Sequence, residues 1–246
     1  MNAPVAVVTG GASGLGELIV RKLHSTGHRV AVADIDLESA NSLAAELGSA
    51  DSVRSYQVDV GDRSAIERLL SAVIIDFGSV EVLVNNAAKT QARPLMDITA
   101  EELDSVMSVG FKGTFTACQI FGAYMAGNRY GRIVNMASLA GQNGGTATGG
   151  HYASAKGAVM SLTKVFAREL APSGVTVNAV SPGPQDSPIV RKIVGEANIE
   201  SYAQTIPVGR LGDPAFIAEM VSLLASPTAA SVTGACWDAN GGLYMR

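Results

Sequence analysis

Residues that hold metals or form disulfides are scarce in this sequence. Its 246 residues include two cysteines and three histidines. Cys118 and Cys236 lie far apart, and neither belongs to a metal-binding or redox spacing, so we expect small buried side chains. The histidines His24, His28 and His151 are also dispersed, and we therefore predict no metal site.

Long apolar runs and clusters of positive charge are missing as well. The apolar runs have the length of β-strands, far short of the roughly 20 residues that span a bilayer. The N-terminus lacks the basic and apolar segments of a secretion signal. Lysine and arginine are scattered and the net charge is −4, which argues against a nucleic-acid-binding stripe. We therefore predict a cytoplasmic protein that binds neither membranes nor nucleic acids.

The sequence does contain an alternation of short apolar segments with longer amphipathic ones. Hydrophobic residues make up 47% of the chain without a break in composition, which predicts a single domain over residues 1–246. The β-branched apolar segments predict strands at 5–9, 29–34, 53–59, 80–85, 132–137, 175–180 and 235–238. Helical spacing predicts helices at 14–26, 37–47, 62–77, 100–126, 152–170 and 214–225. Nearly continuous hydrophobic strands between helices indicate a doubly wound α/β fold, with helices on both faces of a parallel sheet.

Two stretches interrupt this alternation. Residues 139–150 are rich in glycine and threonine, and residues 183–205 begin in a proline-rich turn. Both stretches follow the carboxyl ends of predicted strands, where open α/β sheets bind ligands. We predict that residues 139–150 form a substrate loop and that residues 183–205 form a lid.

A glycine-rich turn joins the first predicted strand to the first predicted helix. Its glycines allow backbone N–H groups and a helix N-terminus to approach a pyrophosphate with no Cβ in the way. The spacing differs from G-x-G-x-x-G, and such a turn can be purely structural, but its position favours a dinucleotide site. The turn residues expected to contact the dinucleotide are Gly10, Ser13, Gly14, Leu15 and Gly16.

An acidic residue ends the second predicted strand. Asp34 lies eighteen residues after Gly16 and can accept hydrogen bonds from both adenosine ribose hydroxyls. A 2′-phosphate there would meet like charge, and no lysine or arginine lies in the glycine turn, so we predict NAD rather than NADP. Asp36 is expected to cap the next helix. Further cofactor contacts are expected at the ends of the next two strands, from Asp59, Val60, Asn86 and Ala87.

Tyr152 and Lys156 stand four residues apart in a predicted helix, and Ser138 precedes Tyr152 by fourteen residues. Positions i and i+4 share one helix face, where a lysine ammonium lowers the pKa of a phenol from its ordinary value of about 10. Such a phenol exchanges protons near neutral pH. Taken alone, the pair is equally consistent with two exposed helix residues.

In combination, these motifs resemble the short-chain dehydrogenase/reductase family over nearly the whole chain. The resemblance rests on residues 9–16, Asp34, Asp59 and Val60, residues 85–88, Ser138, Tyr152, Lys156, Asn178, Pro182 and Gly183, and the closing Asp238, Gly241 and Gly242. It implies a Rossmann fold with a seven-stranded parallel sheet, hydride transfer at a nicotinamide, and a homo-oligomer, most often a tetramer.

The resemblance also implies individual roles. Tyr152 would be the general acid/base, and Ser138 would polarise and orient the substrate oxygen. Lys156 would hold the nicotinamide ribose and lower the pKa of Tyr152. The expected contacts around the nicotinamide are Tyr152, Lys156, Pro182, Gly183 and Ser187, where the Ser187 hydroxyl replaces a threonine that the family often uses for the carboxamide.

Gly110 departs from the family pattern, which commonly places there an asparagine that helps to hold a water connected to the lysine. A glycine in a helix costs about 1 kcal/mol against alanine. We expect the space left by the missing side chain to hold a water, so that the proton relay persists. The alternative is a catalytically impaired NAD-binding sensor or scaffold, against which the retained Ser138, Tyr152 and Lys156 argue.

The expected substrate pocket comprises residues 89–95, 139–148 and 189–202, and its mostly small, apolar or neutral side chains predict a neutral secondary alcohol or ketone. Gln142, Asn143 and His151 are candidate contacts to a second substrate oxygen, although ordinary loop or helix-cap roles are preferred. Residues 206–214 resemble the 3-oxoacyl reductase branch, which generally prefers NADP. That branch, and an isomerase or dehydratase on the same fold, remain alternatives.

Overall fold

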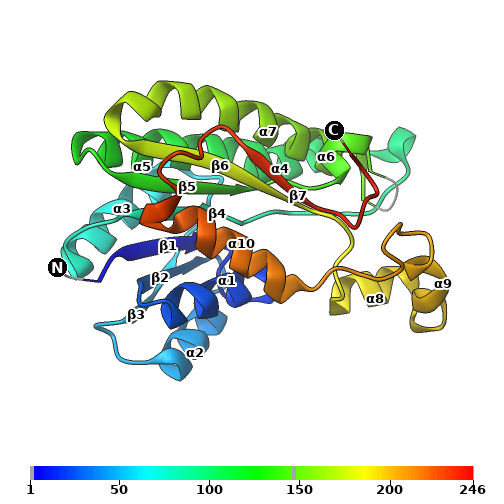
Figure 1. The fold of residues 1–246 in the computed structure, drawn as a ribbon, viewed down its shortest axis with the longest axis horizontal. Coiled ribbons are helices and arrows are strands. Elements are labelled where there is room, and N and C mark those ends of the chain that lie inside the picture. The colour runs from blue at the N-terminus through cyan, green and yellow to red at the C-terminus, as the bar shows by residue number, and fades with distance from the viewer. Residues whose placement is uncertain (1–2, 146–147, 246) are drawn as a thin grey trace.

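The computed structural model describes residues 3–145 and 148–245, and residues 1, 2 and 246 of the predicted domain lie outside this part. It contains a seven-stranded parallel sheet in the order β3-β2-β1-β4-β5-β6-β7 (Figure 1). The strands are β1 (Val5–Thr9), β2 (Arg29–Asp34), β3 (Val53–Gln57), β4 (Val82–Asn85), β5 (Gly131–Met136), β6 (Val175–Pro182) and β7 (Cys236–Ala239). The order reverses between β1 and β4, as in doubly wound folds, and the predicted fold class is confirmed.

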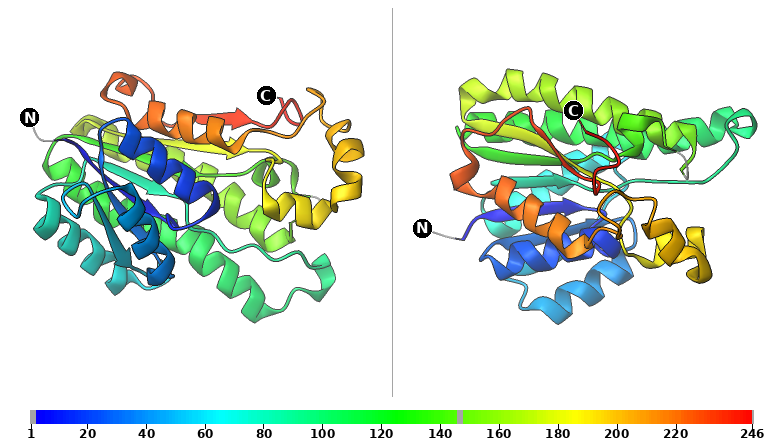
Figure 2. Two further views of the ribbon diagram at one scale, coloured as in Figure 1. Left: turned by 90° about the horizontal axis from the view of Figure 1, so that it is seen from below. Right: turned by 45° about the vertical axis from the view of Figure 1, so that its right-hand side comes forward.

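Helices cover both faces of this sheet (Figures 1 and 2). The α-helices are α1 (Gly14–Ser25), α2 (Leu37–Leu47), α3 (Arg63–Phe77), α4 (Ala100–Met107), α5 (Thr114–Gly127), α6 (Ala140–Asn143), α7 (Gly150–Leu170), α8 (Pro188–Val194), α9 (Ile199–Ala203) and α10 (Pro214–Ala225). Short 3₁₀ turns are η1 (Leu95–Asp97), η3 (Ala171–Ser173), η4 (Glu196–Asn198) and η5 (Pro227–Ala229). Within the described residues, none of the helices combines the length and the apolar character needed to cross a membrane.

Alternating side chains of the strands divide the hydrophobic core into two layers. Val5 and Val7 of β1 belong to the layer that packs against α3, α5 and α7. Ala6 and Val8 of the same strand face the layer formed with α1, α2 and α10. Because both faces are covered, apolar residues occupy successive positions of the central strands, which explains the continuous hydrophobic runs in the sequence.

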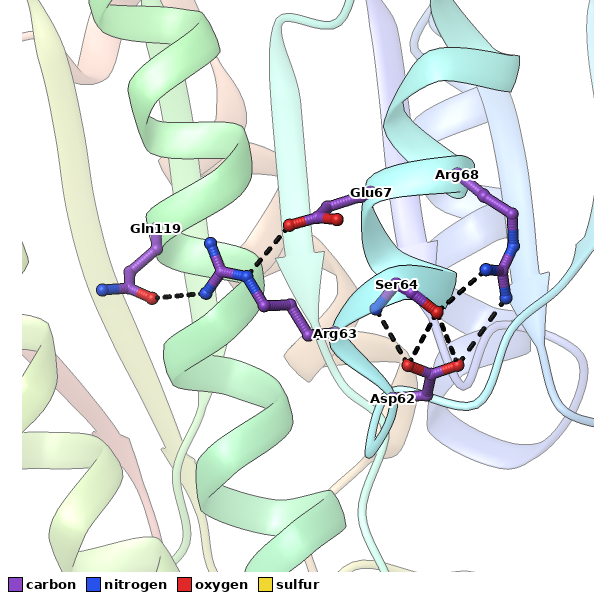
Figure 3. Close-up of polar contacts among 6 residues, drawn as sticks. All are labelled: Asp62, Arg63, Ser64, Glu67, Arg68 and Gln119. Atoms are coloured by element: carbon purple, nitrogen blue, oxygen red, sulfur yellow. Dashed lines mark hydrogen bonds and ion pairs between the residues drawn. The ribbon is translucent and has the colours of Figure 1, made fainter.

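The start of α3 shows how polar contacts fix the helices relative to one another (Figure 3). Asp62 lies just before the helix, and its carboxylate accepts from the backbone N–H of Ser64 at 2.8 Å. Arg63 donates to Glu67 at 2.9 Å within the helix and to Gln119 of α5 at 3.1 Å. The predicted helix began at residue 62, but Asp62 caps the helix instead of joining it.

The helix predicted at residues 100–126 is divided in the structure. A π-helical segment, η2 (Ser108–Gly113), separates α4 from α5. A Cβ on Gly113 would lie 2.8 Å from the carbonyl oxygen of Val60, so the backbone approaches the end of the sheet more closely there than another residue allows. Single-turn π segments within helices often lie at functional sites. The other predicted strands and helices agree with the structure to within two residues at each end.

The strands all point toward one end of the molecule, where α8 and α9 and the loop before α4 project (Figures 1 and 2). The predicted lid, residues 183–205, contains α8, η4 and α9. The predicted substrate loop contains α6 and leads into α7, but its residues Thr146 and Ala147 lie outside the described part. Both predicted loops therefore lie at the sheet end where doubly wound folds bind ligands.

Candidate active site

A cavity of about 470 Å³ lies at the carboxyl ends of β1 to β4. Its lining includes every dinucleotide contact predicted from the first half of the chain: Gly10, Ser13, Gly14, Leu15, Gly16, Asp34, Asp59, Val60, Asn86 and Ala87. Segments that are distant in the sequence therefore meet at one concave surface.

The glycine turn is held in a shape that no other residue type would allow. Gly10 and Gly14 have φ values of +60° and +55°, and a Cβ on Gly16 would overlap the carbonyl group of Gly10. The side-chain amide of Asn86 donates to the carbonyl oxygens of Gly10 at 2.8 Å and Thr9 at 3.2 Å. The turn thus forms a backbone cradle at the start of α1 that fits a pyrophosphate, and Asn86 supports that cradle.

Asp34 lines this cavity, and its carboxylate is fixed by the backbone. One oxygen accepts from the N–H of Ala12 at 3.0 Å, and the other accepts from the N–H of Asp36 at 3.1 Å. Each carboxylate oxygen can accept more than one hydrogen bond, so capacity for ribose hydroxyls is retained. Asp36 accepts from the N–H of Ser39 at 3.1 Å, which confirms its predicted role as a helix cap.

A second, smaller cavity of about 350 Å³ adjoins the glycine turn at Ala12 and contains Arg21. The Arg21 guanidinium donates two parallel hydrogen bonds to Glu46, each 2.7 Å long, and a third to Glu17 at 2.9 Å. These carboxylates raise the pKa of Arg21 above its usual value. The positive charge of Arg21 is therefore already paired with two glutamates.

The three predicted catalytic residues meet where β5 and α7 pack together. Ser138 follows β5, whereas Tyr152 and Lys156 lie on the first turns of α7. Lys156 is 3% exposed, and its ammonium group donates to the carbonyl oxygen of Met136 at 2.5 Å. The same nitrogen lies 5.8 Å from the centre of the Tyr152 ring. The alternative of an exposed helix pair does not fit this burial.

Burial dominates the ionisation of both α7 residues. It raises the pKa of the Tyr152 phenol, and a hydrogen bond with the Ser138 hydroxyl lowers that pKa in part. Burial also lowers the pKa of Lys156 to about 8. We predicted that the Lys156 charge, aided by a bound positive nicotinamide ring, lowers the pKa of Tyr152; in the protein alone the net direction is upward, because removal from water disfavours the phenolate.

Gly110 lies in the π-helical segment, buried against α7. A Cβ on Gly110 would lie 3.3 Å from the Cβ of Ala155, the residue before Lys156. The carbonyl oxygen of Gly110 accepts from the hydroxyl of Thr114 at 3.2 Å. Ala155 of α7 thus packs against one side of the glycine, and our expectation of a water in place of the missing side chain stays a prediction.

The candidate substrate contacts form bonds within the protein. Gln142 donates to Asp238 at 2.6 Å and accepts from the hydroxyl of Ser181 at 3.3 Å. Asn143 accepts from a loop N–H two residues later at 3.0 Å. His151 is 2% exposed, and its Nδ1 accepts from the backbone N–H of Tyr152 at 3.1 Å. These contacts favour the loop and helix-start roles over direct substrate binding.

The remaining predicted nicotinamide contacts, Pro182, Gly183 and Ser187, lie at the end of β6 and in the segment that leads to α8, outside the 470 Å³ cavity. Gly183 donates to the carbonyl oxygen of Ala239 at 2.9 Å, and a Cβ on it would lie 2.7 Å from the Cα of Asn240. The carbonyl oxygen of Pro182 accepts from the N–H of Leu139 at 2.9 Å, so it links β6 to the residue after Ser138. The Ser187 hydroxyl caps α8 by accepting from the N–H of Val190 at 3.4 Å.

The cavity also contains residues that sequence reasoning did not assign to the dinucleotide: Ile35, Val58, Lys89 and Val109. Ile35 and Val58 adjoin the predicted Asp34 and Asp59, so chain proximity was an available signal. Lys89 was predicted for the substrate pocket instead. Val109 belongs to the π-helical segment, which no sequence pattern predicted.

Comparison with known proteins identifies the family. A family model described as "Enoyl-(Acyl carrier protein) reductase" matches residues 10–244. The chain is 37% identical over 245 residues to 3-oxoacyl-[acyl-carrier-protein] reductase FabG of Vibrio cholerae, covering 100% of this chain and 99% of the relative. It is 34% identical over 256 residues to sorbitol dehydrogenase of Cereibacter sphaeroides, with coverage of 100% and 99%.

A solved structure shows the same architecture at full length. A short-chain dehydrogenase/reductase of Brucella melitensis, described as a glucose/ribitol dehydrogenase, has a TM-score of 0.90 and 30% identity, covering 99% of this chain and 97% of that one. The chain belongs to the short-chain dehydrogenase/reductase family, whose members bind nicotinamide dinucleotides, and the resemblance drawn from its motifs is confirmed.

Proposed function

We propose that this oxidoreductase uses NAD to interconvert a neutral secondary alcohol and a ketone. The observation that carries the proposal is the meeting of Ser138, Tyr152 and the buried Lys156 at the sheet end that also contains the 470 Å³ cavity. A bound nicotinamide supplies the site that accepts or donates a hydride. The protein must then position the substrate oxygen and move one proton.

The three residues divide this work by their position. In the oxidative direction, the Tyr152 phenolate takes the proton of the alcohol, and in the reductive direction the phenol returns it to the forming alkoxide. The Ser138 hydroxyl, already within hydrogen-bonding contact of Tyr152, donates to the substrate oxygen and orients it. Lys156 is fixed by the Met136 carbonyl oxygen, and its charge favours the phenolate against the cost of burial.

The charges around the adenosine end support NAD as the cofactor. Asp34 lies in the cavity wall with both carboxylate oxygens facing backbone N–H groups, and no lysine or arginine occurs at residues 9–16. Arg21 is held by Glu17 and Glu46. A 2′-phosphate would therefore meet an acidic region with no unengaged cation in the glycine turn.

Reduced-nicotinamide absorbance tests this function. The purified protein is assayed with NAD and NADP against cyclic, aryl and vicinal-diol alcohols, and with the reduced cofactors against the matching ketones. We expect turnover with neutral alcohols or ketones and a clear preference for NAD. Equal rates with both cofactors would contradict the cofactor assignment. Conversion of a substrate without net change in reduced cofactor would favour an isomerase or dehydratase.

A 3-oxoacyl reductase-like activity is the second candidate, and the 37% identity to a FabG protein over the whole chain favours it. Adding a 3-oxoacyl thioester to the same assay separates the two candidates. A higher kcat/KM for the thioester than for every simple ketone would make this candidate the better one.

We also propose that the protein works in the cytoplasm as a homo-oligomer. The expected oligomer is a tetramer, because tetramers are frequent in this family. Exposed apolar side chains on α5 and α7 support the oligomer, since Phe115 is 38% exposed and Val165 is 60% exposed. The ring of Phe115 lies 5.4 Å from that of Phe166 across these two helices. Light scattering on the purified protein measures the mass, and a clean monomer would contradict this proposal.

A further inference from the structure

The dinucleotide cavity has an uneven distribution of charge. Of the described residues that line it, Asp34, Asp59 and Lys89 carry charged side chains. Asp34 ends β2 and Asp59 follows β3, the strands expected at the adenosine end, whereas Lys89 follows β4. The pyrophosphate of a dinucleotide carries two negative charges, and the glycine turn offers it backbone N–H groups without a cationic side chain.

Lys89 is held at the wall of this cavity by a contact from α4. Its ammonium group donates to the hydroxyl of Ser105 at 2.7 Å. An ammonium has three donors, and this contact uses one of them. Val109, one turn further along the same helical stretch, lines the cavity together with Lys89. Ser105 therefore positions the charge beside the cavity rather than leaving the side chain unrestrained in solvent.

Lys89 also differs from Arg21, the cation beside the adenosine end of the cavity. Arg21 is engaged by two glutamates, whereas in residues 3–145 and 148–245 Lys89 forms no ion pair. An unpaired ammonium next to a dianionic ligand gains charge-assisted hydrogen bonds on binding, at no cost of breaking an existing ion pair.

We propose that Lys89 binds the pyrophosphate of the nicotinamide dinucleotide and that Ser105 positions it for this contact. The proposal deepens the proposed function, since it adds a cofactor-binding residue to that site. It assigns recognition of the phosphates to a side chain at the end of β4 together with the backbone cradle after β1. Lys89 then contributes to cofactor affinity and not to substrate recognition.

Binding measurements on the whole protein test this contact without turnover. Dissociation constants for NADH, ADP-ribose and adenosine are measured by calorimetry or ligand-observed NMR for the natural protein, Lys89→Met and Lys89→Arg. Lys112→Met is the matched control, because Lys112 is exposed in the adjoining π-helical segment and the substitution makes the same change in net charge. Thermal unfolding of each variant checks that the fold is retained.

We expect Lys89→Met to raise the dissociation constants of NADH and ADP-ribose by about fivefold at low ionic strength. This is the upper range for an exposed ion pair. The loss should shrink in about 0.5 M salt because screening weakens the interaction in the natural protein. Adenosine, which lacks phosphates, should bind the variant and the natural protein equally. Lys89→Arg should retain most of the affinity, Ser105→Ala should show a smaller loss than Lys89→Met, and Lys112→Met should be nearly unchanged.

Three results would overturn the proposal. An equal loss of NADH affinity in Lys89→Met and Lys112→Met would indicate a general effect of net charge. An unchanged NADH affinity with a raised substrate KM would assign Lys89 to the substrate. An equal loss for adenosine would show that the phosphates are not the partner. Failure of the natural protein to bind NADH at all would instead contradict the proposed function, so the two failures are distinguishable.

Discussion

The group of Ser138, Tyr152 and Lys156 and the 470 Å³ cavity lie at the same end of the sheet, but their proposed roles depend on different physical effects. Lys156 is 3% exposed, and its ammonium donates to the carbonyl oxygen of Met136. Burial therefore determines the pKa of this lysine. Asp34 and Lys89 line an open cavity and act on ligand charge through a more aqueous environment. A change in the buried group should therefore have one large effect, whereas changes in the cavity should have graded effects that depend on salt.

Replacing Tyr152 with phenylalanine should produce the largest effect. The ring and its packing remain, but the proton donor and acceptor are lost, so we expect kcat to fall by about a thousandfold, within the range for general acid/base catalysis. Affinity for NADH should stay within about twofold, because the phenol contributes to proton transfer more than to cofactor binding. Steady-state assays and NADH titration measure the two quantities. A loss of NADH binding as large as the loss of kcat would remove the contrast between the two regions.

The next largest effect should follow Asp34→Ser. Removing the carboxylate relieves repulsion of a 2′-phosphate and removes an acceptor for ribose hydroxyls, so the ratio of kcat/KM for NADP over NAD should rise by about a hundredfold. Adding Glu46→Gln should raise the ratio further by severalfold, because Arg21 loses its bidentate partner. Glu67→Gln, which removes the partner of Arg63 on α3, is the control of equal charge change. If the control raises the ratio equally, the effect belongs to net charge alone.

The buried lysine should cost stability, and the cost should depend on pH. The pKa of Lys156 is lowered from 10.5 to about 8 in the folded protein. At a pH between these two pKa values, the lysine binds more protons in the unfolded chain than in the folded protein. The free energy of unfolding of the natural protein therefore increases as the pH rises from about 8 toward 10.5. At about pH 7, Lys156→Met should raise the free energy of unfolding by about 2 kcal/mol, less than the full shift implies because the bond to Met136 is lost.

Urea denaturation at about pH 7 and about pH 9.5 measures this difference. The advantage of Lys156→Met should shrink at the higher pH, since the natural lysine is then largely neutral. Lys164→Met serves as the control, because Lys164 is exposed on the same helix. An advantage that stays constant with pH would show that packing, and not the buried charge, separates the variant from the natural protein.

The sequence predicted the sheet and many residues that line the 470 Å³ cavity because both depend on local rules. Alternating burial on a parallel sheet produces continuous apolar strands, and the turn after β1 needs glycines at specific positions. The same rules could not predict the pKa of Tyr152, since it depends on how completely the folded protein removes the phenol from water and on its hydrogen bond with Ser138. The sequence also could not predict the contact of Lys89 with Ser105 of α4, because that contact depends on how the chain packs in three dimensions.

Gly110 is the position where sequence comparison and packing disagree most directly. The family pattern suggests that an asparagine there would restore a proton relay, but a Cβ would lie 3.3 Å from that of Ala155 on the helix that carries the catalytic pair. We expect Gly110→Asn to lower the free energy of unfolding by about 1 kcal/mol or more through overpacking, and to reduce kcat by severalfold as α7 shifts.

Gly127→Asn is the matched control for this last prediction, because Gly127 is exposed at the end of α5 and a Cβ there meets no atom within 4 Å. Its stability and kcat should remain close to those of the natural protein. Denaturation and steady-state kinetics on both variants separate a general intolerance of asparagine from a local clash with α7. A gain in kcat for Gly110→Asn would mean that the helix yields at Ala155 and that a side-chain relay improves the reaction. The catalytic region would then be more adaptable than its close packing indicates.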